Sequence, residues 1–373
     1  MHGTPAMHED RLADRSWAVS VTSGPPQIAD LLRHRARRWR HHSAYSIALS
    51  GSQAIDGSYR PNVLAVSFRR FSLSKVSAVG LHRTTVHLQR AEELMMKTIL
   101  VPTINSPAMK STFETALLLA KRTSAYIEGV PLWFGGPEFV VAEQASSFSM
   151  EIYRARRQEG TVGARKLFES FMQVHGVAPR STTDRPAFGW FAEVPPGEGL
   201  VGSRGRAFDV IVMGRPDADT DAPYNGAIES GLFESGRPVL LSPPTAPKQI
   251  ATNIMIHWNG STEQARANAV AMPLLHLAER VTVLTVVGGQ DVPGPSADEV
   301  RKQLWYNNIA AELVSVELEG RSTGEAVLAA AKADGCDLLI KGAFTRTRLR
   351  QTIFGGATRH IMHHADLPLF MAH

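Results

Sequence analysis

The sequence of 373 residues contains a single cysteine, Cys336. One cysteine excludes an internal disulfide bond and any zinc site built from several cysteines, so nothing requires an oxidising compartment. The sequence also lacks an uninterrupted apolar run long enough to cross a membrane, although 43% of its residues are hydrophobic. We therefore expect a globular protein of the cytoplasm that has no membrane partner.

Common catalytic motifs are absent as well. The sequence has no GxxxxGK[ST] phosphate loop, no GxSxG turn and no HExxH pair. His360, His363 and His364 have spacings that put pairs of them on one helical face, but no carboxylate completes a metal-binding set. Cys336 has no histidine or second cysteine nearby, which favours a buried small side chain over a nucleophile. The sequence thus predicts no catalytic residues and no metal site formed by the chain alone.

The formal net charge of +5 is concentrated near the N-terminus. Residues 1–95 contain thirteen Lys or Arg and seven Asp or Glu, a charge of +6, so the remaining residues sum to −1. The body of the protein is therefore close to neutral, and we expect no nucleic-acid partner.

The basic segment 1–95 lacks the regular apolar spacing of a packed domain, so it is predicted to be a largely disordered N-terminal extension. Its Arg and Ser content fits an organelle transit peptide, but its acidic residues argue against that interpretation. An over-extended gene start is a further interpretation, because Met95 and Met96 directly precede a predicted opening strand. N-terminal sequencing of the native protein would distinguish them.

From Met96 onward, short β-branched runs alternate with helical stretches, which is typical of βαβ units and a parallel sheet. The pattern occurs twice. Residues 99–106 read as a strand and a polar turn before a helix at 111–124, and residues 254–261 repeat this before a helix through Leu275.

The later parts of the two copies also correspond. Residues 208–214 and residues 336–342 each read as a buried strand that ends in glycine. In both copies a Gly-Ala pair lies twelve residues before a proline that opens the last strand. Gly226 precedes Pro238 in the first copy, and Gly356 precedes Pro368 in the second. Equal spacing indicates an internal duplication. A proline-rich stretch at 242–248 is the predicted linker.

These residues resemble the universal stress protein family in its tandem two-domain form. The resemblance covers the chain from Met96 to its end and rests mainly on residues 258–261 and 337–360. It implies two tandem Rossmann-like α/β domains of the adenine nucleotide alpha hydrolase type, at 96–246 and 247–373. Each would be an open parallel five-stranded sheet with helices on both faces. A nucleotide would lie at the carboxyl ends of the strands.

By that resemblance, the family's phosphate loop is a glycine, two residues, a second glycine, nine residues, then glycine followed by Ser or Thr. The corresponding positions here are Gly342, Thr345, Gly355 and Gly356, with Ala357 and Thr358 at the predicted start of a helix. Such a turn lets main-chain N–H groups and the positive end of the helix approach phosphate oxygens. Thr345 replaces a glycine and Gly356 replaces a hydroxyl, so two of the four positions match. The expected cofactor is ATP with Mg²⁺, in the second domain only.

The turn formed by Asn259, Gly260 and Ser261 offers a second contact with the nucleotide. In the family an acidic residue commonly lies at this turn, near the adenosine and the metal, whereas asparagine brings no charge to Mg²⁺. Ser261 would contribute a hydroxyl. The alternative is that the three residues only shape the turn and cap the following helix.

The first domain has a degenerate phosphate loop. Its equivalent segment, residues 215–225, is two residues shorter and has Asn225 in place of Gly355. It also carries Asp217, Asp219 and Asp221, whose carboxylates would repel a triphosphate. We expect this domain to bind no ATP and to serve structurally.

Taken together, these features predict a stress-response protein of regulatory or protective character. The two domains would form an internal pseudo-dimer, compatible with a further homo-oligomer, because fusion raises their effective concentration. An adenine nucleotide would bind the second domain as an effector. Two alternatives stay open, namely a nucleotide-free scaffold that acts by protein association and a weak nucleotide hydrolase.

Overall fold

The computed structural model divides the chain into two compact units, Met1–Val86 and His87–His373. In the first unit, β1 (Val19–Thr22), β2 (Ile47–Ser50) and β3 (Val63–Phe68) form a three-stranded antiparallel sheet in the order β1-β3-β2. The predicted disorder of the leader stays a prediction, because most of residues 1–95 lie outside the described residues. The structure describes residues 19–22, 47–50, 63–68, 96–133, 147–180, 185–191, 198–215, 222–289, 291–343 and 356–373.

The second unit alternates strands and helices, as the sequence predicts. We call residues 96–246 the first half and residues 247–373 the second half. The strands of the first half are β4 (Thr98–Thr103), β5 (Tyr126–Pro131), β6 (Ala178–Pro179), β7 (Ala187–Trp190), β8 (Val210–Gly214) and β9 (Val239–Ser242). Its helices are α3 (Met109–Thr123), α4 (Ser147–Val174), α5 (Glu198–Gly205) and α6 (Ala222–Glu234).

The second half has the same alternation of strands and helices. Its strands are β10 (Asn253–His257), β11 (Arg280–Val287), β12 (Glu312–Glu317), β13 (Leu338–Gly342) and β14 (Leu369–Ala372). Its helices are α7 (Thr262–Leu277), α8 (Ala297–Tyr306), α9 (Thr323–Ala333) and α10 (Gly356–His364).

All of these strands belong to one 11-stranded sheet, in the order β12-β11-β10-β13-β14-β9-β8-β4-β5-β7-β6. Every pairing is parallel except the one between β14 and β9, which is antiparallel. Outward from that antiparallel pair, the strands follow the order β9-β8-β4-β5-β7 in the first half and β14-β13-β10-β11-β12 in the second half. Apart from the two-residue strand β6, each half therefore places its fifth, fourth, first, second and third strand in the same sequence. The α/β class and the mostly parallel sheet of the prediction are therefore confirmed.

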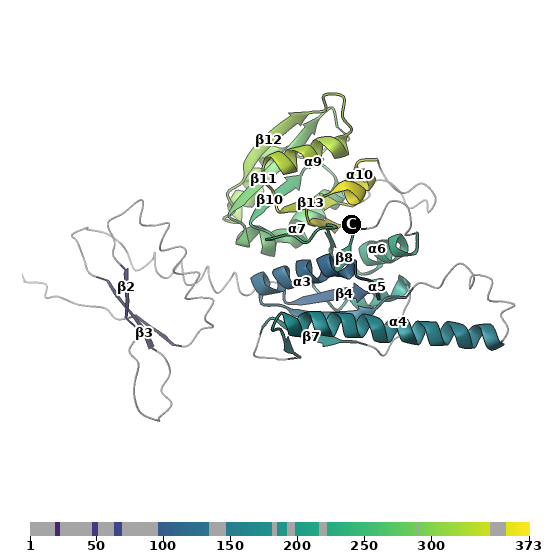
Figure 1. Ribbon diagram of the computed structural model, residues 1–373. Helices are drawn as coiled ribbons and strands as arrows, with labels where there is room; N and C mark the ends of the chain where they lie inside the picture. The colour runs from purple at the N-terminus through teal and green to yellow at the C-terminus, as the bar shows by residue number, and fades with distance from the viewer. Residues whose placement is uncertain are drawn as a thin grey trace, which may run out of the picture. The chain divides into compact units, whose positions relative to one another are not determined.

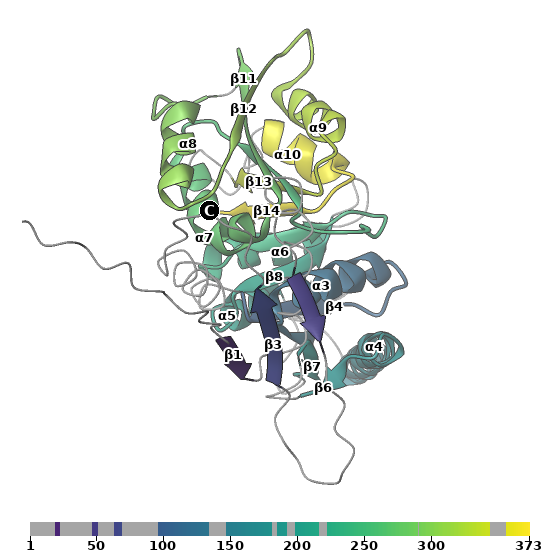
Figure 2. The ribbon, with the colours of Figure 1, turned by 90° about the vertical axis from the view of Figure 1, so that its left-hand side faces the viewer.

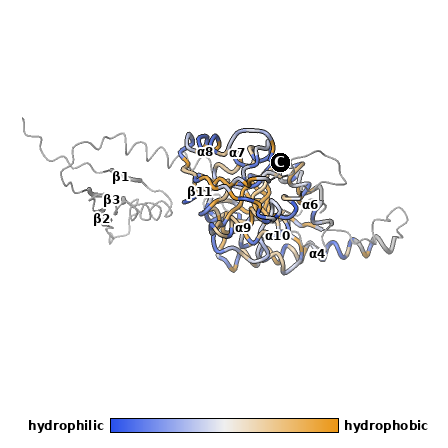
Figure 3. Tube along the Cα trace, turned by 90° about the horizontal axis from the view of Figure 1, so that it is seen from above, coloured by the Kyte–Doolittle hydropathy of each residue, from blue (hydrophilic) through white to orange (hydrophobic). Residues whose placement is uncertain are grey.

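Helices cover both faces of the sheet because successive strand residues point to opposite sides. One face packs apolar side chains of α3, α4, α7 and α8, and the other packs those of α5, α6, α9 and α10. Figure 2 shows the second-half strands with α8 on one side and α9 and α10 on the other, and Figure 1 shows α9 and α10 next to each other. Figure 3 shows hydrophobic residues gathered inside, with hydrophilic ones along exposed helices such as α4.

An aspartate at the start of the fourth strand of each half fixes the first strand beside it. The Asp209 carboxylate accepts hydrogen bonds from the main-chain N–H of Thr98 at 3.0 Å and from its hydroxyl at 2.9 Å. The Asp337 carboxylate accepts bonds from the N–H groups of Thr252 at 2.9 Å and Asn253 at 3.1 Å. These equivalent clamps hold β4 against β8 and β10 against β13.

The two halves are joined by more than the linker. In the β9–β14 pair, Leu240 lies opposite Phe370. Arg122 at the end of α3 donates hydrogen bonds to the carbonyls of Ala251 at 3.0 Å and Leu277 at 2.6 Å, both in the second half. Among the described residues, no helix is both long and apolar enough to cross a membrane.

Candidate functional site

The candidate site lies where β10 and β13 end. These two strands are neighbours, with Ile256 opposite Ile340. The chain leaves β10 toward β11 and leaves β13 toward β14, on opposite sides of the pair. Open α/β sheets bind ligands at this kind of switch point, beyond the carboxyl ends of the strands.

The turn after β10 is held by its own hydrogen bonds. The Asn259 side-chain oxygen accepts from the N–H of Ser261 at 3.3 Å, and the Ser261 hydroxyl caps α7 by accepting from the N–H of Gln264 at 3.1 Å. Gly260 has a φ of 76° and packs against the carbonyl of Val292, which leaves no room for a Cβ. The three residues therefore have the turn-shaping and capping roles of the alternative interpretation. A role in binding nucleotide stays a prediction.

Gly342 ends β13 in close contact with the first turn of α7. Its main-chain N–H donates to the side-chain oxygen of Gln264 at 2.7 Å, and Gln264 is fully buried. A Cβ at Gly342 would overlap the main chain of Gln264 and come within 2.6 Å of that of Glu263. The Gly342 N–H is thus bonded by a protein side chain, and a role of Gly342 in binding nucleotide stays a prediction. Glycine is needed here for the approach of helix to strand.

The remaining positions of the predicted phosphate loop fall in the connection from β13 to α10. Thr345 and Gly355 lie outside the described residues. Gly356 is the first residue of α10, and a Cβ there would meet nothing within 4 Å. Ala357 and Thr358 are buried in the first turn, with 8% and 6% of their surface exposed. The predicted helix start is therefore confirmed, and the anion-binding role of its tip stays a prediction.

Two buried basic side chains at this edge were missed by the motif search. His257 ends β10 and is 1% exposed, and Lys341 lies one residue before the end of β13 and is 3% exposed. Because Ile256 pairs with Ile340, His257 and Lys341 occupy the next positions on adjacent strands. Both point to the face covered by α9 and α10, since Met255 and Leu339, two residues earlier, do so.

Neither side chain has a partner among the described residues. Both ring nitrogens of His257 are buried without a hydrogen bond. Burial, then the nearby charge of Lys341, lowers the pKa of His257 well below its ordinary value. Burial alone lowers the pKa of Lys341 from 10.5 to about 8. No carboxylate in the described part of the chain opposes either shift, so within that part the pair is an uncompensated basic centre.

The corresponding positions of the first half are apolar. By the correspondence of residues 208–214 with 336–342, Met213 stands where the second half has Lys341. Pro102 stands where it has His257. The signal in the sequence was a lysine inside the otherwise apolar run Leu338–Gly342. Comparison of the two halves would have shown that this lysine replaces an apolar residue.

The equivalent edge of the first half is filled by its own residues. A Cβ at Gly160 of α4 would come within 2.6 Å of the Trp133 ring, and one at Gly163 would overlap the Asn105 side chain. The N–H of Gly214, the counterpart of Gly342, donates to the Tyr224 hydroxyl at 2.7 Å. Helix α4 thus lies directly against the residues that follow β4 and β5.

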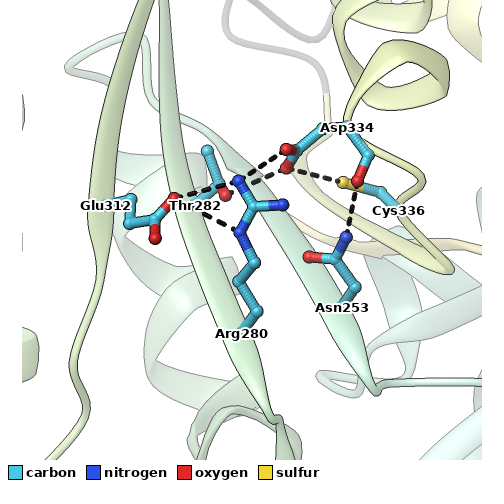
Figure 4. A network of polar contacts seen from close by, with 6 residues as sticks. All are labelled: Asn253, Arg280, Thr282, Glu312, Asp334 and Cys336. Carbon is cyan, nitrogen blue, oxygen red and sulfur yellow. Dashed lines mark hydrogen bonds and ion pairs between the residues drawn. The ribbon is translucent and has the colours of Figure 1, made fainter.

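A polar network at the opposite, amino edge of the second half has a structural role (Figure 4). Asp334, at the end of α9, accepts an ion pair from Arg280 at 2.6 Å and a hydrogen bond from the Thr282 hydroxyl at 3.1 Å. Its main-chain carbonyl accepts from the Asn253 side chain at 2.7 Å. The Cys336 thiol contacts the same carboxylate at 3.5 Å, and burial together with Asp334 raises its pKa to about 12. The raised pKa keeps the half-buried thiol protonated at neutral pH, and the absence of a nucleophilic role stays a prediction.

The histidines of α10 do not gather a metal site within the described part of the chain. The rings of His360 and His364 stack with centroids 4.2 Å apart, and His364 donates to the carbonyl of His360 at 2.8 Å. In the same part of the chain no group of three or more His, Cys, Asp or Glu side chains is arranged to hold a metal ion.

Comparisons with known proteins agree with this architecture. A universal stress protein from Archaeoglobus fulgidus DSM 4304 is 12% identical, with a TM-score of 0.55 over 75% of this chain and 97% of its own. At that identity the likeness establishes the fold alone, an α/β fold of the universal stress protein type. A universal stress protein family member from Burkholderia pseudomallei is 20% identical over 34% of this chain and 98% of its own, with a TM-score of 0.26. No curated protein sequence matches the chain.

A family model matches the sequence of the second half. Residues 252–373 match the family model described as the universal stress protein family. The predicted resemblance is therefore confirmed over these residues.

Proposed function

We propose that this chain is a tandem universal stress protein, a regulatory or protective stress-response protein whose second half binds an adenine nucleotide as an effector. The observation that carries this proposal is the family match over residues 252–373. ATP, accompanied by Mg²⁺, is the expected ligand, and the first half serves structurally. The protein acts in the cytoplasm.

The tandem arrangement, with domains at 96–246 and 247–373, is supported by the mirrored strand order on either side of the β9–β14 pair. The matched clamps at Asp209 and Asp337 are a second line of support, because they occupy equivalent positions. In this proposal the antiparallel β9–β14 pair joins the two domains into an internal pseudo-dimer.

Nucleotide binding by the second half is supported by the geometry around α10. Its N-terminus follows the carboxyl end of β13, and the position of Gly356 is open to close approach by a ligand. Helix N-termini attract anions because their N–H groups are unsatisfied and the helix dipole is positive there. The packing of Trp133 and Asn105 against α4 supports a structural role for the first half.

Two measurements test the proposal. Mass spectrometry of small molecules released from the purified protein should detect an adenine nucleotide. Isothermal titration with ATP and Mg²⁺ should give heat with the wild type and none with Gly355→Val, which puts a branched side chain where the family's phosphate loop has glycine. Asn225→Val, at the counterpart position of the first half, is the matched control and should bind like the wild type.

The same measurements separate the alternatives. If the wild type carries no nucleotide and gives no heat, the nucleotide-free scaffold is favoured. If phosphate is released from ATP by the wild type and lost in Gly355→Val, the protein is a hydrolase. Release that survives in the variant would indicate a contaminating enzyme.

A further inference from the structure

The buried pair His257 and Lys341 has no explanation in the packing of the second half. Each side chain is at least 97% buried, since 1% and 3% of their surfaces are exposed. Polar groups removed from water without hydrogen bonds are costly, and a charged amine is more costly still. The first half has Pro102 and Met213 at the equivalent positions, so the fold itself does not require basic residues there.

Among the described residues, no carboxylate affects the pKa of either member of the pair. The titratable side chains on the helices covering this face are Glu325, Lys332, Arg359, His360, His363 and His364. None of these affects the pKa of Lys341, and His257 responds only to Lys341. The adjacent strands present Leu284 and Met371 at the paired positions, which are uncharged.

The location makes a ligand the natural source of that charge. His257 and Lys341 lie at the carboxyl ends of the two strands that flank the switch point. Helix α10 begins beside the start of α9, because a Cβ at Gly324 would come within 3.1 Å of the Ala357 carbonyl oxygen. The first N–H groups of α10 and the amine of Lys341 would therefore approach one anion from two sides.

We propose that His257 and Lys341 form an anion-binding centre that holds a phosphate group of the ligand and makes its binding dependent on pH. Lys341 supplies the charge, and the neutral imidazole of His257 donates one N–H. The inference rests on the proposed function in taking the ligand to be a nucleotide. Beyond that function, we infer that the second half recognises the phosphate of the nucleotide through His257 and Lys341, two side chains that the first half lacks.

The pH dependence follows from the protonation of Lys341. With its pKa near 8, the free amine is about nine-tenths protonated at pH 7 and about one-tenth protonated at pH 9. A bound phosphate favours the charged form, so binding at pH 9 requires proton uptake. Affinity should be about tenfold lower at pH 9 than at pH 7, and this loss should disappear when Lys341 is replaced.

The test compares wild type, Lys341→Met, which copies Met213, and Lys332→Met, which makes the same change at an exposed position of α9. Calorimetry with ATP, pyrophosphate and adenosine at pH 7 and pH 9 should show ATP binding weakened tenfold or more by Lys341→Met and unchanged by Lys332→Met. Pyrophosphate should compete with ATP on the wild type. Adenosine should bind both lysine variants as it binds the wild type.

Other outcomes are equally informative. Equal ATP affinity of wild type and Lys341→Met would overturn the anion-binding centre and leave the proposed nucleotide function intact. Pyrophosphate binding that requires Lys341, without any binding of ATP or adenosine, would retain the centre and overturn the nucleotide function. Absence of binding by all three probes would overturn both.

Discussion

Replacing Lys341 by methionine should make the ligand-free protein more stable. The lysine is 3% exposed on β13 and has no partner among the described residues. Methionine occupies the equivalent position of the first half at Met213, where its side chain is fully buried. The substitution therefore replaces a desolvated amine with an apolar side chain that the same strand position accepts.

The magnitude follows from the pKa of Lys341. A fall from 10.5 in the unfolded chain to about 8 in the folded protein means that the charged amine costs the folded state about 3 kcal/mol. Because the folded pKa is the lower one, this cost is complete below pH 8 and decreases as pH rises toward 10.5. Lys341→Met should thus be more stable by up to about 3 kcal/mol at pH 7, with a smaller advantage at pH 10.

Urea denaturation of nucleotide-free protein at pH 7, 8, 9 and 10 measures this advantage. The buffer must be free of phosphate, because a bound anion would stabilise the wild type selectively. Lys332→Met, an exposed site, should change stability by less than about 0.5 kcal/mol at every pH. The reasoning is refuted if Lys341→Met is less stable than the wild type at pH 7, or if its advantage does not vary with pH.

Three further predictions follow from the same structure. Gly342→Ala should lower the free energy of unfolding by about 1 to 3 kcal/mol because its Cβ meets the main chain of α7. Gly356→Ala should raise the free energy of unfolding by up to about 1 kcal/mol. Thermal melts of both variants test these two changes. His257→Leu should reduce the loss of stability below pH 6.5, because a histidine kept neutral when folded takes up a proton on unfolding; equal acid sensitivity of variant and wild type would contradict this. Cys336 should react slowly with iodoacetamide at pH 8 in the native state and rapidly in urea, since its pKa is about 12; rapid native labelling, followed by mass spectrometry, would disprove it.

The fold could be predicted largely because its signals are local. Strands such as Leu338–Gly342 read as short apolar runs between helical stretches. The equal spacing from Gly226 and Gly356 to the following prolines predicted a repeat. The antiparallel meeting of β9 and β14 was not predictable, because it depends on pairing between segments far apart in the chain.

The site was predicted less completely, since motif matching assigns a role by position and ignores competing partners. Gly342 matched the family loop, but its N–H is bonded by Gln264, a residue that no motif includes. Asn259 and Ser261 were predicted with two alternatives, and the observed hydrogen bonds belong to the structural one. His257 and Lys341 belong to no motif, and their importance appears only once their burial and the unsatisfied ring nitrogens of His257 are known.

The join between β9 and β14 lies within one polypeptide, which has a genetic consequence. In a symmetric dimer of identical chains, a codon change alters both subunits, so an unfavourable buried group is introduced twice. Here each codon affects only one of the two halves, so the first half can keep the apolar Met213 at the position equivalent to Lys341. Lysine at position 341 can therefore arise with half the penalty that a homodimer would carry.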